Sequence, residues 1–360
     1  MLSSARYSPS LGGVQTHARE IATRLNRSHD VTVITSNPGL ELPVTDVIDG
    51  VTINRVKTWP ASGDPFIPRG WVKQLKSLQP DVVILDGYQS VVSAWALMST
   101  IRHNIPLIVV YHEGANANGL RQALYPLQRR ILARWFRRAR FTVATAPHEV
   151  ELYQKELSLN AERLKYIPNG ADMPTPAVRP EVDPWHLVCI GRLERQKRHH
   201  IVIDALAQLR TPETPWHLTV IGRGEEQSVL AAQAADLDIA DAVTFRSFDQ
   251  HERELLAGTL QSARLVIAPS LYETHPMAVI EAAALGCHVL VPAEGNEGVV
   301  GLARRGIVEA VPSFDSNQFV SSIRVASTTT FTPNREELVT WDDAAEEFDA
   351  MIQQIASEKE

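Results

Sequence analysis

Short runs of valine, isoleucine and leucine recur along the whole chain and alternate with longer stretches of helical character. The runs cover 31–35, 82–85, 107–111 and 141–144 in the first half, and 187–190, 218–221, 242–245, 265–268 and 288–291 in the second. Apolar strands separated by helices are typical of parallel sheets that are covered on both faces. The pattern predicts an α/β fold with two doubly wound domains, and ligands beyond the carboxyl ends of the strands, in a cleft between the domains.

Length and charge agree with a division into two domains. The chain has 360 residues, enough for two domains that each bury a sheet. Residues 1–170 carry a formal charge of +7 and residues 171–360 a charge of −14, which indicates that the halves face different partners. A proline-rich segment without apolar periodicity favours a linker at 172–184. We therefore expect domains at 1–171 and 185–340, followed by a final helix at 341–360.

The two cysteines indicate a reducing compartment. Cys189 and Cys287 lie in apolar, strand-like contexts without paired spacing, which is typical of reduced core residues in a cytoplasmic protein. No apolar run approaches the roughly 20 residues that cross a bilayer, and no signal-peptide pattern is present.

The most informative local feature is a pair of acids that flank a strand-to-helix loop. Glu273 follows the apolar run at 265–268, and Glu281 lies in the helical stretch 278–285. Backbone N–H groups at a helix start attract phosphate, and a carboxylate one turn later can accept hydrogen bonds from sugar hydroxyls. The alternative is an acidic helix start whose second glutamate faces solvent.

The stretch from Pro269 to Gly286, which contains both glutamates, resembles the signature of the retaining glycosyltransferases of family 4, a group with the GT-B fold. Further matches follow in family order along almost the whole chain. They are Gly12-Gly13-Val14-Gln15-Thr16-His17, His112 after the strand 108–111, Ile167-Pro168-Asn169-Gly170, and Gly191-Arg192-Leu193-Glu194-Arg195-Gln196-Lys197. The resemblance implies two Rossmann-like domains, the first on the acceptor side and the second binding a nucleotide sugar, with the final helix packed back on the first domain.

The resemblance also implies roles for individual residues. Arg192 and Lys197 would contact the diphosphate and stabilise the charge that grows on the leaving group. Glu281 would hold the ribose, while Glu273 and His112 would contact the donor sugar. For the two basic residues, the alternative is a solvated loop. For His112, the alternative is a structural hydrogen bond at a strand end.

Several neighbours complete the implied nucleotide-sugar site. Between the glutamates, His275, Met277 and Ala278 would contact sugar or phosphate, whereas Pro276 has no N–H to donate. Gly222 and Gly224 match the family's glycine turn near the nucleobase. Gly12 and Gly13 either allow a phosphate or acceptor to approach the backbone or simply form a tight turn before the helix at 16–25.

By resemblance, the reaction is transfer of a sugar from a nucleotide-diphosphate sugar to a hydroxyl acceptor by a metal-independent front-face mechanism with retention of configuration. No cofactor is expected, and Asp236 and Asp238 fit a polar helix end better than a metal site. Two other functions remain open. One is a GT-B-like sugar-nucleotide epimerase, and the other is a non-catalytic sugar-nucleotide-binding protein.

A basic stretch at 120–140 bears on the acceptor. It contains seven arginines and no acid, interleaved with apolar residues, which favours an amphipathic helix on an anionic membrane, near a lipid-linked acceptor. The protein would then be peripheral on the inner face of the membrane. The alternative is an ordinary packed helix with solvated arginines. Nucleic acid is not expected as a partner, because no binding motif accompanies the patch and the chain is acidic overall.

The start of the chain departs from the family pattern. Only Met1-Leu2-Ser3-Ser4 precedes the loop that begins at Ala5, so the first strand is short or missing. This predicts that the natural start lies upstream of Met1, or that the first sheet is weakened.

Overall fold

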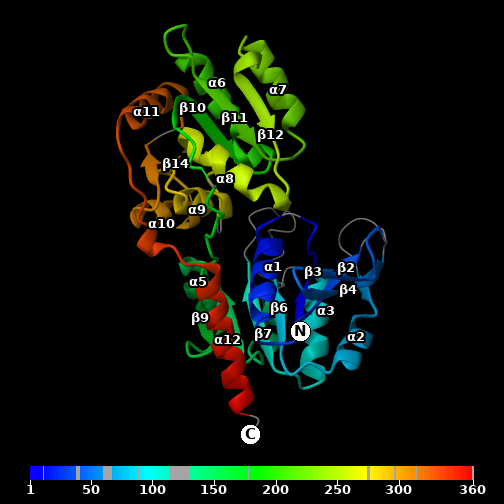
Figure 1. Cartoon of the computed structure of the whole chain (residues 1–360). Coiled ribbons are helices and arrows are strands. Elements are labelled where there is room, and N and C mark those ends of the chain that lie inside the picture. The colour runs from blue at the N-terminus through cyan, green and yellow to red at the C-terminus, as the bar shows by residue number, and fades with distance from the viewer. Residues whose placement is uncertain are drawn as a thin grey trace. The chain divides into compact units, whose positions relative to one another are not determined.

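The computed structural model describes residues 1–10, 12–37, 41–59, 67–87, 90–112, 130–176, 178–273, 276–295, 297–312 and 314–358. It divides into two compact units (Figure 1). Unit 1 comprises Met1–Gly170 together with Thr340–Glu360, and unit 2 comprises Ala171–Val339. The chain thus leaves unit 1 once and returns to it with its last helix.

Unit 1 is built on a mostly parallel sheet with the strand order β3-β4-β2-β1-β6-β7-β8-β9. Its strands are β1 (Leu2–Ser4), β2 (Thr32–Asn37), β3 (Thr45–Ile48), β4 (Val51–Trp59), β5 (Ile67–Arg69), β6 (Val83–Asp86), β7 (Leu107–Tyr111), β8 (Phe141–Ala144) and β9 (Leu164–Tyr166). β3 and β5 pair antiparallel with β4, and the other pairs are parallel. The strand order reverses between β1 and β6, which is the pattern of a doubly wound sheet.

The first strand is short but present. β1 lies between β2 and β6, where Leu2 pairs with Val33 on one side and with Ile84 on the other. Leu2, Ser3 and Ser4 are all buried, as a central strand between two parallel neighbours requires.

The described helices of unit 1 are α1 (Gly13–Leu25), α2 (Trp71–Leu78), α3 (Val91–Arg102), α5 (Pro147–Leu157) and α12 (Trp341–Ser357), with a further helical stretch at 130–136. One apolar cluster joins α2, α3, α5 and the helical stretch to the sheet, and it includes Trp71, Leu97, Tyr111 and Phe136. Residues 113–129, which carry much of the predicted basic helix, lie outside the described residues. In the remaining part, Leu132, Ala133 and Phe136 are buried in this cluster and pack on the protein, whereas Ile131 is exposed.

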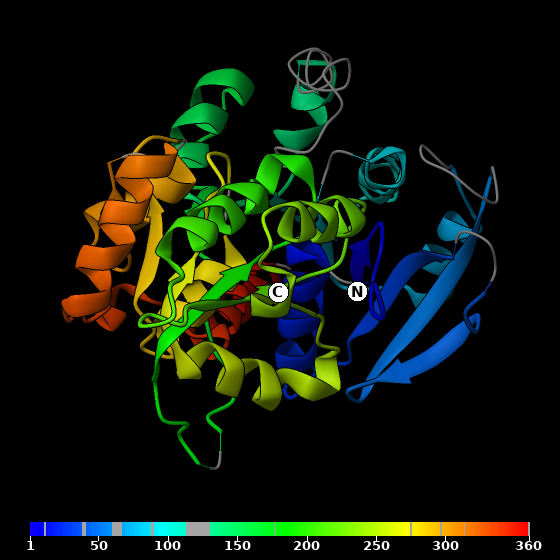
Figure 2. The ribbon, with the colours of Figure 1, turned by 90° about the horizontal axis from the view of Figure 1, so that it is seen from above.

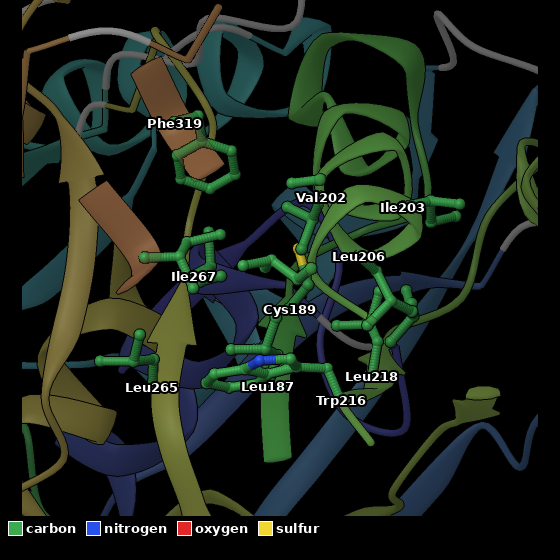
Figure 3. Close-up of a cluster of buried hydrophobic side chains, with 14 of the residues drawn as sticks. Leu187, Cys189, Val202, Ile203, Leu206, Trp216, Leu218, Leu265, Ile267 and Phe319 are labelled. Atoms are coloured by element: carbon green, nitrogen blue, oxygen red, sulfur yellow. The ribbon is translucent and has the colours of Figure 1, made fainter. Parts of the chain in front are cut away.

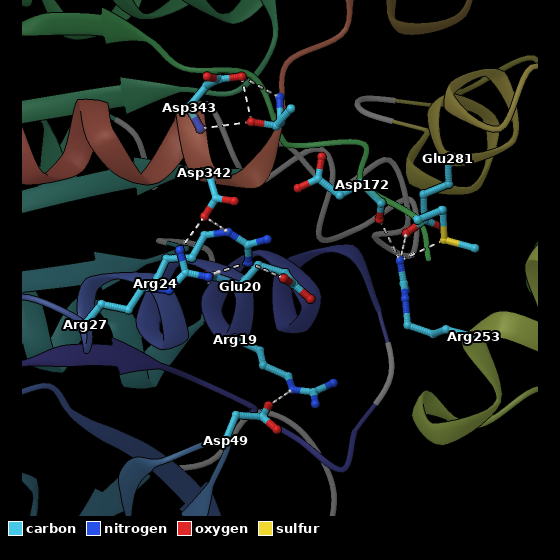
Figure 4. Close-up of polar contacts among 12 residues, drawn as sticks. Arg19, Glu20, Arg24, Arg27, Asp49, Asp172, Arg253, Glu281, Asp342 and Asp343 are labelled. Carbon is cyan, nitrogen blue, oxygen red and sulfur yellow. Dashed lines mark hydrogen bonds and ion pairs between the residues drawn. The ribbon is translucent and has the colours of Figure 1, made fainter. Parts of the chain in front are cut away.

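α12, which is red in Figure 1, packs against α1. A capping box at Thr340 and Asp343 starts the helix, and Asp342 accepts hydrogen bonds from Arg24 in the last turn of α1 and from Arg27 just after it (Figure 4). Gly170 lies against the start of this helix, where an added Cβ would come within 2.4 Å of the Trp341 backbone nitrogen. The Asn-Gly match at 169–170 therefore allows close packing here.

Unit 2 holds a parallel sheet with the order β12-β11-β10-β13-β14-β15. Its strands are β10 (Asp183–Ile190), β11 (His217–Ile221), β12 (Val243–Arg246), β13 (Ala263–Ile267), β14 (Val289–Pro292) and β15 (Glu309–Val311). Its helices are α6 (His199–Leu209), α7 (Gln227–Asp236), α8 (Arg253–Ser262), α9 (Met277–Ala284), α10 (Glu297–Arg304) and α11 (Ser316–Thr328). β10 includes the last two residues of the linker predicted at 172–184.

The core of unit 2 explains why its strands are apolar throughout. Leu187 and Cys189 of β10 pack with α6 and α11 on one face, where Figure 3 shows Val202, Leu206 and Phe319 gathered around them. Val188, between them in sequence, packs on the opposite face with residues of α8, α9 and α10. The helices of unit 2 accordingly lie on both sides of its strands (Figure 2).

No helix in the described parts of the chain is both long enough and apolar enough to cross a membrane.

Candidate active site

The strand order of unit 2 reverses between β10 and β13, which lie side by side as parallel strands. At such a point the loops after the two strands run to opposite faces of the sheet and leave room for a ligand. The loop after β10 carries Arg192 and Lys197, and the loop after β13 carries Glu273. The fold therefore brings the two most specific sequence motifs to one place, although they are far apart along the chain.

The contact between the two loops is direct. The Nζ atom of Lys197, at the end of the 3-10 helix η2 (Arg195–Lys197), forms an ion pair with Oε1 of Glu273. Both side chains are largely buried, so water screens the pair only weakly. Arg192, in the same loop as Lys197, pairs with Glu194, and its side chain is half-exposed. One cation of the loop after β10, Lys197, thus meets the acid of the loop after β13.

A buried histidine holds the loop after β10 in place. His199, the first residue of α6, lies 2.9 Å from Sγ of Cys189 through Nδ1 and 3.1 Å from the carbonyl oxygen of Arg192 through Nε2. A neutral ring satisfies both contacts, since Nε2–H donates to the carbonyl and Nδ1 accepts from the thiol. Burial lowers the pKa of His199 to about 4 and raises the pKa of Cys189. The thiol therefore serves as a hydrogen-bond donor in the core.

Two glycines let the loops after β10 and β11 touch. A Cβ on Gly222 would lie 1.9 Å from the carbonyl oxygen of Gly191, and one on Gly224 would lie 2.2 Å from that of Leu193. Gly222 also has a φ of 153°, which side chains with a Cβ rarely adopt. The glycine turn predicted near a nucleobase thus also sets the distance between two neighbouring loops.

The second glutamate of the motif lies inside α9, one turn from its start at Met277 and Ala278. Glu281 is buried to 8 % exposure, and its Oε1 lies 3.0 Å from Nη2 of Arg253, the first residue of α8. Figure 4 shows Arg253 reaching toward Glu281 and the backbone of Asp172. A solvent-facing second glutamate is therefore excluded. Thr274 and His275 lie outside the described residues.

Unit 1 contains a second polar cluster, centred on Asp86 at the end of β6. Oδ1 of Asp86 lies 2.9 Å from Nδ1 of His17 in α1 and 2.8 Å from Nε2 of His112, directly after β7. The other oxygen, Oδ2, is buried and has no hydrogen-bond partner among the described residues. The His17 ring lies in edge contact with His112, Trp341 and Phe348. β1 and β6, where the strand order of unit 1 reverses, border this cluster.

Charge is shared unevenly within this cluster. Burial alone would raise the pKa of Asp86, but the two imidazoles outweigh it and hold that pKa well below its usual range. Burial lowers the pKa of His17, and the nearby carboxylate only partly offsets this. For His112 the balance is reversed, because Asp86 outweighs burial and raises its pKa. The cluster therefore favours an ionised Asp86 with His112 as its preferred cation.

Gly12 and Gly13 lie at the amino end of α1. Gly12 is the N-cap residue, with a φ of 156°, and its carbonyl oxygen accepts a hydrogen bond from the Thr16 amide at 2.9 Å. Their position agrees with both interpretations of the sequence, a tight turn and a close approach of backbone to ligand.

The fold and the sequence of the chain both match those of known glycosyltransferases. The two doubly wound units form the GT-B fold of glycosyltransferases, and the solved structures that resemble the chain agree. Residues 11–173 match the family model "Glycosyltransferase Family 4", and residues 176–337 match "Glycosyl transferases group 1". The chain belongs to the family 4 glycosyltransferases.

One relative in sequence and two similar solved structures illustrate these resemblances. The chain is 28% identical over 318 residues to glycogen synthase of Mycobacterium tuberculosis, covering 80% of this chain and 76% of the relative. The structure resembles sucrose-phosphate synthase from Thermosynechococcus elongatus with a TM-score of 0.75 at 20% identity, covering 99% and 98% of the two chains. It resembles HepE of Anabaena, solved in complex with UDP and glucose, with a TM-score of 0.65 at 17% identity, again covering 99% and 98%.

Sequence reasoning missed several residues of both clusters. Asp86 ends an apolar strand run, and an acid at that position is a signal that could have been noticed. His17 is the last residue of the matched segment that begins with Gly12 and Gly13, but the resemblance predicted no role for it. Arg253 and His199 belong to no motif. Only the fold brings Arg253 to Glu281 and His199 to the loop after β10.

Proposed function

We propose that the chain is a retaining glycosyltransferase that moves a sugar from a nucleoside diphosphate sugar to a hydroxyl acceptor. The observation that carries the proposal is the ion pair between Lys197 and Glu273 at the strand reversal of unit 2. It joins the residue predicted to bind the diphosphate to the residue predicted to contact the donor sugar. The complex of the similar HepE with UDP and glucose supports a donor of this kind.

The charges of unit 2 fit the departure of a nucleoside diphosphate. A diphosphate bound beside Lys197 and Arg192 would compete with Glu273 and Glu194 for these cations. The cations stabilise most strongly the state in which negative charge has grown on the leaving oxygen. The start of α9 adds backbone N–H groups between the two glutamates of the motif. The carboxylate of Glu281, inside α9, accepts hydrogen bonds from the ribose hydroxyls.

In the proposed reaction, the bond from the anomeric carbon to the phosphate oxygen breaks, and its electron pair leaves with the nucleoside diphosphate. The acceptor oxygen forms its bond on the same face of the sugar, which retains the configuration. The acceptor proton passes to a phosphate oxygen of the leaving group. This route uses the positive groups of unit 2 in place of a metal ion, so we propose that no metal and no cofactor is required.

The arginines at 130–140 support a lipid-linked acceptor and peripheral binding at the inner face of a membrane. In the described part of the basic stretch, Arg134, Arg137 and Arg138 are exposed, as is Ile131, while Leu132, Ala133 and Phe136 are buried. Contact with a membrane would then be electrostatic, at about 1 kcal/mol for each basic residue near an anionic surface. Sedimentation with anionic vesicles tests this. Binding should fall with salt and in the Arg134→Gln, Arg138→Gln variant, and salt-independent binding would contradict it.

The first experiment is a thermal-shift panel with UDP, GDP, ADP and dTDP sugars. We expect the sugars of one base to stabilise the wild type, by about 2.7 kcal/mol when the free ligand is a hundredfold above its Kd. The double variant Lys197→Ala, Glu281→Ala should lose this shift. Arg210→Ala, which removes an exposed pair with Asp241 outside the site, is the matched control and should keep it.

The same panel separates the alternatives. A shift that depends on Lys197 and Glu281, followed by transfer to an acceptor with the anomeric configuration kept in the NMR coupling constant, supports the proposal. Interconversion of the free sugar nucleotide without acceptor would indicate an epimerase instead. Binding without turnover toward any acceptor or water would indicate a non-catalytic binding protein. The absence of any shift would refute the donor site itself.

A further inference from the structure

One atom of the Arg253 side chain contacts three acceptors near the predicted nucleotide site. Its Nη2 atom lies 3.0 Å from Oε1 of Glu281, 3.1 Å from the carbonyl oxygen of Asp172 and 2.8 Å from Sδ of Met173 (Figure 4). These partners come from two segments, since Glu281 lies in α9, while Asp172 and Met173 belong to the first residues of unit 2. The guanidinium is thus held from several directions.

The position of Arg253 is unfavourable unless an acid compensates it. It is the first residue of α8, directly after a capping box formed by Asp249 and Glu252. The amino end of a helix carries a partial positive charge, so a cation there is repelled. Glu281 supplies the opposite charge, and its side chain is 10 % exposed, so the attraction is weakly screened. The pairing therefore fixes both side chains.

We propose that Arg253 is a positioning residue that orients the Glu281 carboxylate toward the ribose of the bound nucleotide. This inference rests on the proposed function, in which Glu281 accepts the ribose hydroxyls. A carboxylate on a flexible side chain must be held in one rotamer to receive two neighbouring hydroxyls, and a hydrogen bond from a fixed guanidinium does this. Arg253 contacts no substrate in this role and acts through Glu281.

Lysine would not replace the arginine in this role. All three contacts are made by Nη2, whose N–H groups have fixed directions in the plane of the guanidinium, and the acceptors belong to two different segments. An ammonium at the same place would keep the charge but would lose the fixed geometry. Arg253→Lys therefore separates orientation from charge.

The test measures ribose recognition as a ratio. The base is the one selected by the panel of UDP, GDP, ADP and dTDP sugars, and the probes are its ribonucleoside diphosphate and the 2′,3′-dideoxy form of the same nucleotide. Kd is measured for both with the full-length wild type, Arg253→Ala, Arg253→Lys, Glu281→Ala and the double variant Arg253→Ala, Glu281→Ala. Arg210→Ala, which also breaks an arginine–carboxylate pair, is the matched control.

We expect the wild type and Arg210→Ala to prefer the ribo form by about 10-fold or more, since hydrogen bonds to a charged group are the strong ones. Arg253→Ala and Glu281→Ala should each reduce this preference to about threefold or less, and Arg253→Lys should lose most of it. The double variant should be no worse than Glu281→Ala, because both changes remove the same interaction.

Other results would overturn the inference. If Arg253→Ala weakens both nucleotides equally and keeps the ratio, the arginine contributes charge and does not position Glu281. If the double variant loses clearly more than Glu281→Ala, Arg253 acts independently. A wild type that binds nucleotide without ribose preference would remove the role of Glu281, and with it that of Arg253. A wild type that binds no nucleotide would refute the proposed function itself.

Discussion

The carboxylate of Asp86 shows how one buried residue can set the state of two others. It is shared by His17 and His112, and it raises the pKa of His112 while His17 stays below the usual value. A buried acid between two rings is stable only because both contacts are made at once. The predicted role of His112 therefore depends on a neighbour that no motif contains.

Replacing Asp86 by asparagine tests this dependence. Asp86→Asn keeps the shape but removes the charge, so the pKa of His112 should fall, and the free energy of unfolding should drop by on the order of 3 kcal/mol. NMR titration of the imidazole signals and denaturant unfolding measure the two effects. Asp342→Asn, which changes an exposed acid paired with Arg24 and Arg27, is the control and should cost less than about 1 kcal/mol. An unchanged His112 titration would contradict the assignment.

His199 gives unit 2 a defined response to acid. Its folded pKa is about 4, while an unfolded histidine titrates near 6.5. Between these values the unfolded chain binds more protons, so stability is lost as pH falls from about 6.5 toward 4, by on the order of 3 kcal/mol from this residue. Denaturant unfolding at pH 7, 5.5 and 4.5 should show a weaker pH dependence in His199→Gln than in the wild type.

At the scale of elements, the loops of unit 2 are joined by backbone contacts as well as by side chains. The turn after β11 touches the loop after β10 at Gly222 and Gly224. The loop after β13 meets the same loop through Lys197 and Glu273. Three loops of the site, which follow the neighbouring strands β11, β10 and β13, are therefore positioned by the strand ends and by the space that two glycines leave open.

Gly222→Ala tests the contact between these loops. The added Cβ would meet the Gly191 carbonyl oxygen, and backbone cannot yield as a flexible side chain does, so we expect a loss of stability on the order of 2–4 kcal/mol and weaker nucleotide binding. Gly258→Ala in α8 is the matched control, because its Cβ meets nothing within 4 Å. That variant should gain up to about 1 kcal/mol, as alanine favours a helix. Equal stability of both variants would contradict the argument.

The sequence predicted elements best where strands are apolar on both faces. β7 and β8 match the predicted runs at 107–111 and 141–144, and the other predicted runs lie within two residues of a strand, except that β10 begins four residues before its run at 187–190. β3, β4, β5, β9 and β15 were not predicted, because β4 has partly alternating burial and the other four are short, with exposed or half-buried residues. Lys197 and Glu273 were both named from motifs, but their contact depends on the order of β10 and β13, which no local pattern reveals.

At the scale of the whole molecule, metal independence is the broadest proposal. Activity should be unchanged in a chelator, because the leaving group meets Lys197 and Arg192. The measurement is sugar transfer with EDTA present, followed by addition of Mg²⁺ or Zn²⁺. His17, Asp86 and His112 hold ligand-type atoms within 4.8 Å of one another, so they are the first residues to change if EDTA abolishes activity. Loss of activity with recovery on metal would defeat the proposal.

The return of α12 to unit 1 has a consequence for biosynthesis. Trp341 and Phe348, which border His17, are made after the whole of unit 2. Residues 171–339 are synthesised before these two aromatic rings. Unit 1 therefore begins before unit 2 but lacks the packing of these rings until unit 2 has been made. Until α12 is made, the side of α1 that it covers is exposed, and exposed apolar surface on an incompletely folded chain favours aggregation.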